Sequence, residues 1–242
     1  MRYIVAMPGK SPIRSIGIIM DGNRRWAKAR GLPSFEGHRQ GYEALKKLAD
    51  EFPRLKETYG LEYATLYAFS TENWKRSADE VEFLMQIFAS ALTEMIDSVT
   101  KGLAEEKKIR IRIAGQRERF SPQLRKLMDT VEEKTKDFTA GTVCFALSYG
   151  GRAEIVNAAN EIIKNGDEMS EENVNKYLWT AGIPDPDLVI RTSGEERVSG
   201  FLTWQSVYSE LFFTDTLWPD FTVIELEKIF AEFHERERRH GT

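Results

Sequence analysis

Five short apolar runs, separated by longer segments of helical period, constrain the fold of this chain more than any other feature of its sequence. The runs are IGIIM (16–20), YATLYAF (63–69), IRIRIA (109–114), TVCFALS (142–148) and DLVI (187–190). Strands that alternate with helices pair in parallel, and strands that are apolar throughout are covered by helices on both faces. IRIRIA alternates and predicts one wet face, while residues 207–213 fit either a strand or a helix. We therefore predict an α/β fold with a central, mostly parallel six-stranded sheet flanked by helices.

We expect one domain over residues 1–242, with 1–14 as an N-terminal extension and 223–242 as a C-terminal helix and tail. At 242 residues and 41% hydrophobic content the chain can bury a substantial core, and no linker, repeat or low-complexity tract divides it. The apolar run at residues 3–7 is too short for a signal or membrane segment, which predicts a cytoplasmic protein.

Composition argues against two kinds of site. The 34 basic and 38 acidic residues give a net charge of −4, which leaves no global electrostatic footprint for nucleic acid. Cys144 is the single cysteine, it lies in an apolar run, and the three histidines are scattered, so a buried thiol is expected and a zinc site is not. Any anion site must therefore be local.

Arginines and small polar residues follow four of the predicted strands. Ligands of open α/β sheets bind beyond the carboxyl ends of the strands, and forked donors with backbone amides are suited to phosphate oxygens. The segments are Asp21-Gly22-Asn23-Arg24-Arg25-Trp26, Ser70 to Arg76, Tyr149-Gly150-Gly151-Arg152, and Arg191 to Ser199. The acidic residues among them indicate a divalent cation. Neither GxGxxG after the first strand nor GxxxxGK[ST] is present, so neither a dinucleotide fold nor a P-loop is predicted.

The first of these segments predicts a strand, a tight turn and a helix. Asp21-Gly22 is a hairpin signal, but residues 24–29 are helix formers and do not alternate in polarity. A helix that starts here presents free backbone N–H groups, which attract anions. Taken alone, Asp21 is more often a turn former or helix N-cap than a metal ligand, and His38, Ser70, Arg191 and Arg197 also have ordinary structural readings.

A second segment predicts a long amphipathic helix. Residues 79–102 carry one apolar stripe at helical spacing, formed by Val81, Leu84, Phe88, Leu92, Met95 and Val99. The stripe fits a face of the core, and it also fits the wall of an apolar tunnel. Residues 223–239 predict a further helix whose charged end, HERERRHG, leaves the domain body.

Five motifs resemble those of the cis-prenyltransferases, the undecaprenyl diphosphate synthase family. They are MDGNRRWA, GHRQG, YAFSTENWKR, SYGGR and DLVIRTSGEERVSGFLTWQSVYSELFFTDTLWPDF, and the likeness runs from about residue 16 to residue 241. The resemblance implies that an allylic prenyl diphosphate loses its diphosphate, isopentenyl diphosphate attacks C1, and a Z double bond forms. It also implies Mg²⁺ as cofactor and an apolar substrate tunnel, which favours the tunnel reading of the stripe at 81–99.

The resemblance assigns roles position by position. It implies that Asp21, Ser70 and Asn73 are catalytic, and that Asp21 and Glu210 are associated with the metal. It places Gly22, Asn23, Arg24, Arg25 and His38 on the donor diphosphate. It places Trp26, Trp74, Arg76, Arg191, Arg197, Ser199, Arg239 and Gly241 on the acceptor, the last two as part of a C-terminal Arg-x-Gly that completes the neighbouring subunit's site.

The chain departs from the family pattern in its donor site. Ser34 stands where an arginine is usual, and Arg24 stands where glycine is frequent. Loss of one charge-assisted contact costs about 1.5–3 kcal/mol of anion binding, for which Arg24 is a candidate replacement. Ser15, Ser148 and Gly200 differ as well, where the family commonly has His, Asn and Asn. The altered donor pocket at Ser34, together with Gly200, favours a short or medium product, or an acceptor other than isopentenyl diphosphate, whereas Ser15 predicts a packing difference of little consequence.

Two alternatives without catalysis stay open at this point. One is a non-catalytic subunit of a heteromeric prenyltransferase, and the other is a lipid-phosphate binding module. Non-catalytic subunits of this family typically lack the first-strand aspartate. This chain keeps Asp21, Asn23, Arg25, Arg191 and Arg197 together, which argues against that alternative. The expected partners are prenyl diphosphates and a second copy of the chain, without nucleic acid, and the lipid substrates and product would bring the protein to a membrane surface.

Overall fold

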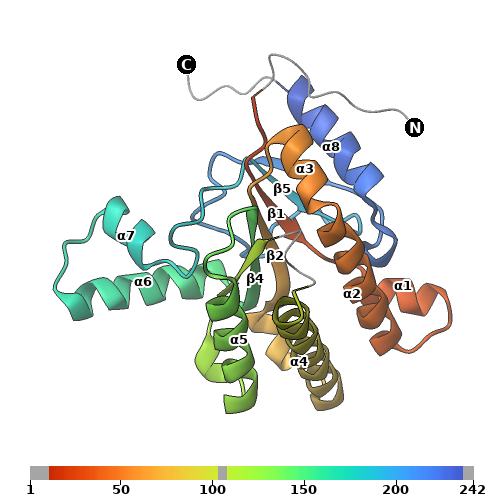
Figure 1. Ribbon diagram of the computed structural model, residues 1–242, viewed down its shortest axis with the longest axis horizontal. Coiled ribbons are helices and arrows are strands. Elements are labelled where there is room, and N and C mark those ends of the chain that lie inside the picture. The colour runs from red at the N-terminus through yellow and green to blue at the C-terminus, as the bar shows by residue number, and fades with distance from the viewer. Residues whose placement is uncertain (1–10, 103–107, 237–242) are drawn as a thin grey trace.

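The structure, a computed structural model, describes residues 11–102 and 108–236 (Figure 1). Within them, six strands form one sheet in the order β3-β4-β2-β1-β5-β6, and every neighbouring pair is parallel. The strands are β1 (Ser15–Ile19), β2 (Tyr63–Ser70), β3 (Ile109–Ala114), β4 (Gly141–Tyr149), β5 (Leu188–Arg191) and β6 (Glu210–Phe213). The predicted α/β sheet is confirmed, and only the last four residues of the ambiguous segment 207–213 form a strand.

Helices connect the successive strands except β5 and β6, which a loop over residues 192–209 joins. They are α1 (Asn23–Ala29), α2 (Ser34–Asp50), α3 (Phe52–Tyr59), α4 (Ala78–Thr100), α5 (Pro122–Thr135), α6 (Gly151–Asn165), α7 (Glu171–Tyr177) and α8 (Val223–Glu235). Short 3₁₀ turns lie at η1 (Thr71–Lys75), η2 (Arg117–Arg119) and η3 (Trp218–Asp220). The helices expected at 79–102 and 223–239 correspond to α4 and α8. No helix in the described parts of the chain has the length and apolar character needed to cross a membrane.

The two faces of the sheet are covered differently. The main core cluster joins all six strands to α2, α3, α4, α5 and α8. A smaller cluster on β1, β3, β4 and β5 packs under Phe201 and Leu202, and it includes the fully buried Cys144 thiol, whose pKa burial raises to about 12. Helices α6 and α7 extend away from the sheet on the side opposite α2 and α8 (Figure 1).

Local sequence explains where these elements begin. All five residues of β1 are buried, which accounts for its continuous apolar character. Helix α4 begins after Ser77, whose side chain accepts from the Glu80 amide, and α8 begins after Thr222, which forms a capping box with Glu225. Of the predicted extension 1–14, Ile13 is fully buried, so the last residues before β1 already belong to the core.

The topology places β1 at the point where the strand order reverses. The chain runs from β1 to β2 and on to β3 and β4, then crosses to β5 on the other side of β1. The loops that follow β1, β2 and β5 consequently meet at the carboxyl edge of the sheet. This is where open α/β sheets bind their ligands.

Candidate active site

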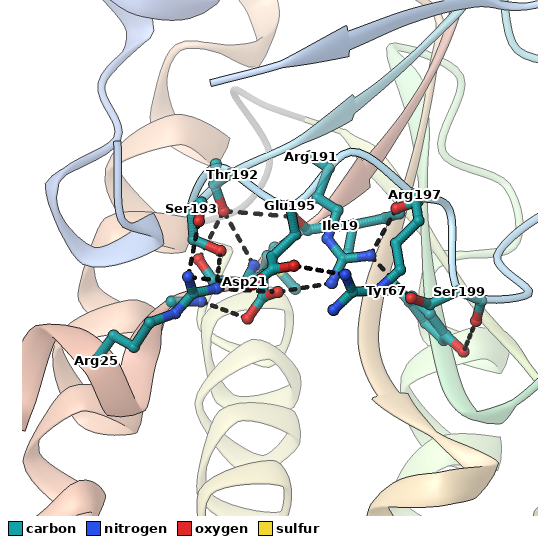
Figure 2. Close-up of polar contacts among 12 residues, drawn as sticks. Ile19, Asp21, Arg25, Tyr67, Arg191, Thr192, Ser193, Glu195, Arg197 and Ser199 are labelled. Carbon is teal, nitrogen blue, oxygen red and sulfur yellow. Dashed lines mark hydrogen bonds and ion pairs between the residues drawn. The ribbon is translucent and has the colours of Figure 1, made fainter. Parts of the chain in front are cut away.

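Asp21 follows β1 and lies at the centre of the polar contacts at this edge (Figure 2). Its Oδ2 accepts a hydrogen bond from Arg191 Nη2 at 2.8 Å and lies 3.5 Å from Arg25 Nη2. Its Oδ1 accepts from the Gly22 amide at 2.7 Å. Burial of the carboxyl opposes ionisation, but the hydrogen bond and charge of Arg191, the Gly22 amide and the charge of Arg25 together lower the pKa of Asp21 below its ordinary value. Asp21 is therefore ionised at neutral pH.

Arg191, the last residue of β5, is a buried cation held on three sides. Its side chain is 6% exposed. Besides the bond to Asp21, its Nη1 donates to the Ser199 hydroxyl at 2.8 Å and to the Arg197 carbonyl (Figure 2). The loop after β5 thus folds back so that its backbone and Ser199 orient the guanidinium that faces Asp21.

Side-chain hydrogen bonds tie the loop after β1 to the loop after β5. The Asp21 amide donates to Thr192 Oγ1 at 3.0 Å, and this hydroxyl donates to the Asp21 carbonyl at 2.7 Å. Arg25 Nη1 donates to the Ser193 carbonyl at 2.9 Å and lies 3.4 Å from Glu195 Oε1 (Figure 2). The carboxylate and its two arginines are consequently positioned as one unit.

Two glycines in GHRQG allow α2 to approach α1 closely. A Cβ at Gly37 would lie 2.0 Å from the Asn23 carbonyl oxygen, and one at Gly41 would lie 2.2 Å from Asn23 Oδ1. No side chain larger than hydrogen fits there without moving Asn23. Between these glycines lies His38, whose side chain is 8% exposed. Burial lowers the pKa of His38 despite its contact with Glu80, so the imidazole is neutral at pH 7.

Glu80 is a site residue that sequence reasoning missed. Its Oε1 accepts from Arg76 Nη1 at 2.8 Å and lies 3.3 Å from His38 Nε2. Its Oε2 lies 3.9 Å from Arg24 Nη1. The four-residue spacing of Arg76 and Glu80 was the available signal, although Arg76 itself precedes α4. The contacts of Glu80 with Arg24 and His38 depend on how α1 and α2 pack against α4, and no sequence pattern predicts them.

The turn after β2 is held by Asn73. Its Oδ1 accepts from the Ser70 amide at 3.0 Å and so closes η1. The Ser70 and Asn73 side chains, both singled out from the sequence, line the same cavity as Arg191 and Ser199.

Two polar cavities meet at Asp21. The first, which we call the α1 cavity, measures about 670 Å³, and its lining includes Gly22, Arg24, Arg25, Lys28 and Ser34. The second, the β4 cavity, measures about 730 Å³, and its lining includes Ser70, Asn73, Gly151, Arg152, Arg191 and Ser199. Both are lined by Met20, Asp21, Asn23, His38 and Arg76. The Asp21 carboxylate therefore lies on the wall shared by two basic cavities.

An apolar cavity adjoins the polar pair, between α2 and α4 over the sheet. Its lining includes Leu84, Phe88, Leu92 and Met95 from the stripe predicted on α4. Leu84 and Leu92 also belong to the buried core, with Phe88 and Met95 packed against it, so the core-face reading holds and the tunnel wall stays a prediction. His38 and Asn23 belong to both this cavity and the polar ones, so the apolar space opens beside Asp21.

Comparison with known proteins agrees with this geometry. Residues 19–241 match the family model described as putative undecaprenyl diphosphate synthase. The chain belongs to this family. Curated relatives named isoprenyl transferase include one from Neisseria meningitidis, 45% identical over 94% of this chain and 89% of the relative, and one from Thermotoga maritima, 46% identical over 93% and 95%. This member of the undecaprenyl diphosphate synthase family is accordingly a prenyltransferase.

Solved structures share the fold. Lavandulyl diphosphate synthase from Lavandula x intermedia, solved in complex with dimethylallyl diphosphate, has a TM-score of 0.86 and 31% identity, covering 95% of this chain and 98% of that one. A probable undecaprenyl diphosphate synthase from Campylobacter jejuni has a TM-score of 0.79 and 34% identity, covering 96% and 100%.

Three aromatic or basic residues predicted for the acceptor site of this prenyltransferase line none of the cavities described. The Trp26 indole N–H donates to Asp220 Oδ1 at 2.7 Å, and Trp74 donates to Ser148 Oγ at 2.8 Å. Arg197 is 61% exposed and pairs with Glu195. Arg239 and Gly241 lie outside the described residues.

Pairing Glu210 with Asp21 as ligands of one metal ion is not realised within one chain. Glu210 begins β6 opposite Leu188, whereas Asp21 follows the carboxyl end of β1. Since β6 runs parallel to β5, the three residues from Glu210 to Phe213 separate it from that edge by about 10 Å. Glu210 instead accepts from Arg236 Nη1 at 3.1 Å. The correction follows from strand direction, which places Glu210 at the amino edge.

Proposed function

We propose that the chain is a Mg²⁺-dependent cis-prenyltransferase that condenses isopentenyl diphosphate with an allylic prenyl diphosphate to form a Z-polyprenyl diphosphate. One observation carries this proposal: Asp21 lies on the wall shared by two basic cavities, beside an apolar one. The arrangement matches the needs of two diphosphate heads and one hydrocarbon tail. The complex of lavandulyl diphosphate synthase with dimethylallyl diphosphate supports an allylic diphosphate as one of the two ligands.

The α1 cavity is assigned to the allylic diphosphate. Gly22, with φ of 106°, lets the chain turn into α1, whose first residues line the cavity together with Arg25. Neutral His38 has a single N–H, which faces Glu80 Oε1 at 3.3 Å here, so it would donate to a phosphate oxygen by releasing Glu80. The leaving diphosphate gains negative charge as its bond to carbon breaks, so donors fixed in advance stabilise the transition state more than the bound substrate.

The β4 cavity is assigned to isopentenyl diphosphate. Arg191 faces it with its orientation fixed by Asp21 and Ser199, and Arg152 joins it from the start of α6. A guanidinium held in this way binds phosphate oxygens in a defined plane, which sets the direction of the attacking double bond. Ser70 and Asn73 line the same space and are proposed to position the acceptor and receive its proton.

The donor set fits Mg²⁺ held by one carboxylate and substrate phosphates. No cluster of three His, Cys, Asp or Glu side chains that could hold an ion alone occurs in the described residues. Mg²⁺ commonly binds one or two carboxylates together with phosphate oxygens, and ionised Asp21 faces both cavities. Asp21 would hold the ion, which when bound would offset the charge of the departing diphosphate.

Arg24 is proposed to supply the donor-side charge that Ser34 lacks. Both residues line the α1 cavity. Arg24 is 59% exposed and only loosely paired with Glu80 at 3.9 Å, so its guanidinium is free to turn to a ligand. Arg24→Gly should weaken binding of the allylic diphosphate about ten- to a hundredfold, and Arg24→Gly/Ser34→Arg should restore it. Unchanged binding by Arg24→Gly, measured calorimetrically, would exclude this role.

A direct assay tests the overall proposal. The protein is incubated with Mg²⁺, radiolabelled isopentenyl diphosphate and allylic primers of several lengths, and extended Z products are sought. Label in a prenyl chain with a new Z double bond is the expected result. Primer consumption without label points to another acceptor, and turnover only after addition of a second protein points to a non-catalytic subunit. Tight binding without turnover at any Mg²⁺ concentration leaves only a lipid-phosphate binding module.

We further propose a homodimer. Val207 and Tyr208 are 70% and 74% exposed, and Leu211 and Phe213 on the edge strand β6 are more than a third exposed. Apolar side chains gathered beside an open strand edge are typical of a surface that another chain covers. Light scattering should give twice the chain mass, and Val207→Asp should shift the protein toward monomer.

A further inference from the structure

Ser148 is the extra residue of a β-bulge at the carboxyl end of β4. In the pairing of β2 with β4, Phe69 lies opposite Leu147. The next pair is Ser70 and Tyr149, so β4 has one residue more than β2 at this point. The Ser148 backbone has a φ of 50°, in the left-handed region that serine rarely adopts. Bulges with such backbone angles re-aim a side chain and are common beside active sites.

The bulge turns the Ser148 side chain toward η1. By strand alternation Ser148 would share the face of Cys144 and Ala146, which belong to the smaller core cluster. Its hydroxyl instead accepts a hydrogen bond from the Trp74 indole N–H at 2.8 Å, and Trp74 packs against the main core cluster. The same hydroxyl donates to Gln116 Oε1 at 3.4 Å, and the Ser148 carbonyl accepts from the Gln116 amide at 3.2 Å. Ser148 is fully buried, so its hydroxyl cannot exchange these partners for bulk water.

Three more side chains surround the Trp74 indole. Phe69 meets it edge-on with the ring centroids 4.9 Å apart, and the Phe120 centroid lies 5.5 Å away. The Arg119 guanidinium lies 4.8 Å from the indole centroid. We call these three side chains, together with Ser148, the indole socket. Trp74 lies in this socket and lines neither polar cavity nor the apolar one beside them.

The turn that carries Trp74 also presents Ser70 and Asn73 to the β4 cavity. In a 3₁₀ turn, residues three apart lie on one side, and neighbouring residues point about 120° apart. Ser70 and Asn73 are three apart, are joined by the bond from the Ser70 amide, and line the β4 cavity. Trp74 is the neighbour that points into the indole socket. Gly150 lets β4 approach the same turn closely, since a Cβ there would lie 2.7 Å from Thr71 Oγ1. The socket thus fixes the rotation of η1.

We propose that Ser148 is a positioning residue of the acceptor site: through the Trp74 indole it sets the direction of the side chains that η1 presents to the β4 cavity. This inference rests on the proposed binding of isopentenyl diphosphate in that cavity and deepens it. It also gives Trp74 a role other than the predicted contact with the acceptor, because the indole anchors the turn without touching substrate. A serine in left-handed backbone costs stability, and such a cost persists where the surrounding structure requires it.

Removing either partner of the Ser148–Trp74 hydrogen bond tests the inference. Ser148→Ala and Trp74→Phe should each raise KM for isopentenyl diphosphate about three- to tenfold, as loss of one hydrogen bond predicts. The double variant should do no worse than the single ones, because both remove the same bond. Calorimetric affinity for the allylic diphosphate should stay unchanged, because the two η1 side chains line the β4 cavity and not the α1 cavity. Trp204→Phe, which removes an indole bond of 2.8 Å to Asn175 outside these cavities, is the matched control.

Two further variants separate the Ser148 hydroxyl from its backbone. Glycine adopts a positive φ without strain but has no hydroxyl, so Ser148→Gly should raise KM as Ser148→Ala does. Asparagine tolerates a positive φ and carries an acceptor, so Ser148→Asn should keep KM close to that of the unmodified protein. An unchanged KM in Ser148→Gly would overturn the inference, because the hydroxyl would then do nothing for the acceptor.

The outcomes separate the inference from the function beneath it. If the unmodified protein forms no extended prenyl product, the proposed function fails. If it does, and KM for isopentenyl diphosphate is unchanged in both Ser148→Ala and Trp74→Phe, the inference alone fails. A lower kcat with an unchanged KM would also overturn it, because a smaller fraction of folded protein has that effect.

The hydrogen bond itself can be observed without turnover. In a ¹⁵N-labelled sample, the indole N–H of Trp74 is identified among the five tryptophans by its absence in Trp74→Phe. It should exchange with solvent more slowly in the unmodified protein than in Ser148→Ala, because a buried hydrogen bond protects it. Equal exchange rates would exclude the anchor whatever the kinetics show.

Discussion

The polar cavities at Asp21 and the apolar space between α2 and α4 hold their ligands by different kinds of interaction. Around Asp21, hydrogen bonds from Arg191 and the Gly22 amide fix the carboxylate, and one from the Thr192 hydroxyl fixes the backbone carbonyl. Between α2 and α4, packing dominates, and the Tyr42–Glu94 hydrogen bond, the Lys46–Glu94 ion pair and the His38–Glu80 contact link the two helices. A reacting head must be placed within a fraction of an ångström, whereas a tail needs only shelter from water. Changes in the first region should therefore alter rate, and changes in the second should alter product.

Among the changes in the polar region, Asp21→Asn should lower the rate of prenyl transfer most. The amide keeps the shape of the side chain but removes the charge that faces both cavities and pairs with Arg191. We expect kcat/KM for prenyl transfer to fall at least about a hundredfold, as loss of one preorganised electrostatic group commonly does. Radiolabel incorporation measures it, with thermal unfolding as the control for folding. A loss smaller than threefold would remove Asp21 from the centre of the site.

Arg191→Lys should have the next largest effect. Lysine keeps the charge but cannot donate to Asp21, Ser199 and the Arg197 carbonyl at once, as the guanidinium does. Loss of one charge-assisted bond of about 1.5–3 kcal/mol predicts a rise of about ten- to a hundredfold in KM for isopentenyl diphosphate. Arg39→Lys, at an exposed arginine paired with Glu36, is the matched control and should change little. Equal effects of the two substitutions would contradict the prediction.

Ala91→Leu probes the apolar side. Ala91 is 8% exposed and lines the apolar cavity between α2 and α4, which the larger side chain would partly fill. Products should shorten while turnover of the shortest primer stays close to that of the unmodified protein, at a cost of about 1–3 kcal/mol in stability from overpacking. Chromatography of the reaction products gives the length. If rate fell as far as in Asp21→Asn with length unchanged, the division between the regions would be lost.

The smallest expected effect concerns pH and His38. The folded state lowers the pKa of His38 below 6.5, so the unfolded chain takes up the proton first as pH falls. The stabilising contribution of neutral His38 is complete above 6.5 and declines below it toward the folded pKa. Urea unfolding between about pH 7.5 and 5.5 should show the stability advantage over His38→Gln shrinking as pH falls. An advantage that grew in acid would mean that Glu80 outweighs burial and that the sign is reversed.

Much of the fold could be predicted because its strands are buried on both sides. Continuous apolar runs marked β1, β2, β4 and β5 to within two residues, and alternation marked β3 as a strand with a wetter face. The segment 207–213 was ambiguous because its composition fits either period. The last four residues form β6 by pairing with β5, which is a tertiary effect.

The site was predictable where residues follow strand ends and unpredictable where helix rotation decides. Asp21 and Arg191 meet because their strands are neighbours. Adjacent positions on α1 point about 100° apart, so Arg25 faces the loop after β5 while Trp26 turns to Asp220. Glu80 escaped notice because two of its partners belong to α1 and α2. Glu210 was misplaced because a motif does not reveal which end of a strand reaches the site.

The central place of β1 also bears on how the protein is made. Asp21 and Arg191 are 170 residues apart in the chain, yet they close the catalytic edge. A growing polypeptide completes β1 and its first neighbour early, but the second neighbour leaves the ribosome only when most of the chain has been translated. Contacts of such long sequence separation slow folding. The nascent enzyme should therefore gain its substrate-binding competence late in synthesis, in a single closing step that joins its beginning to its end.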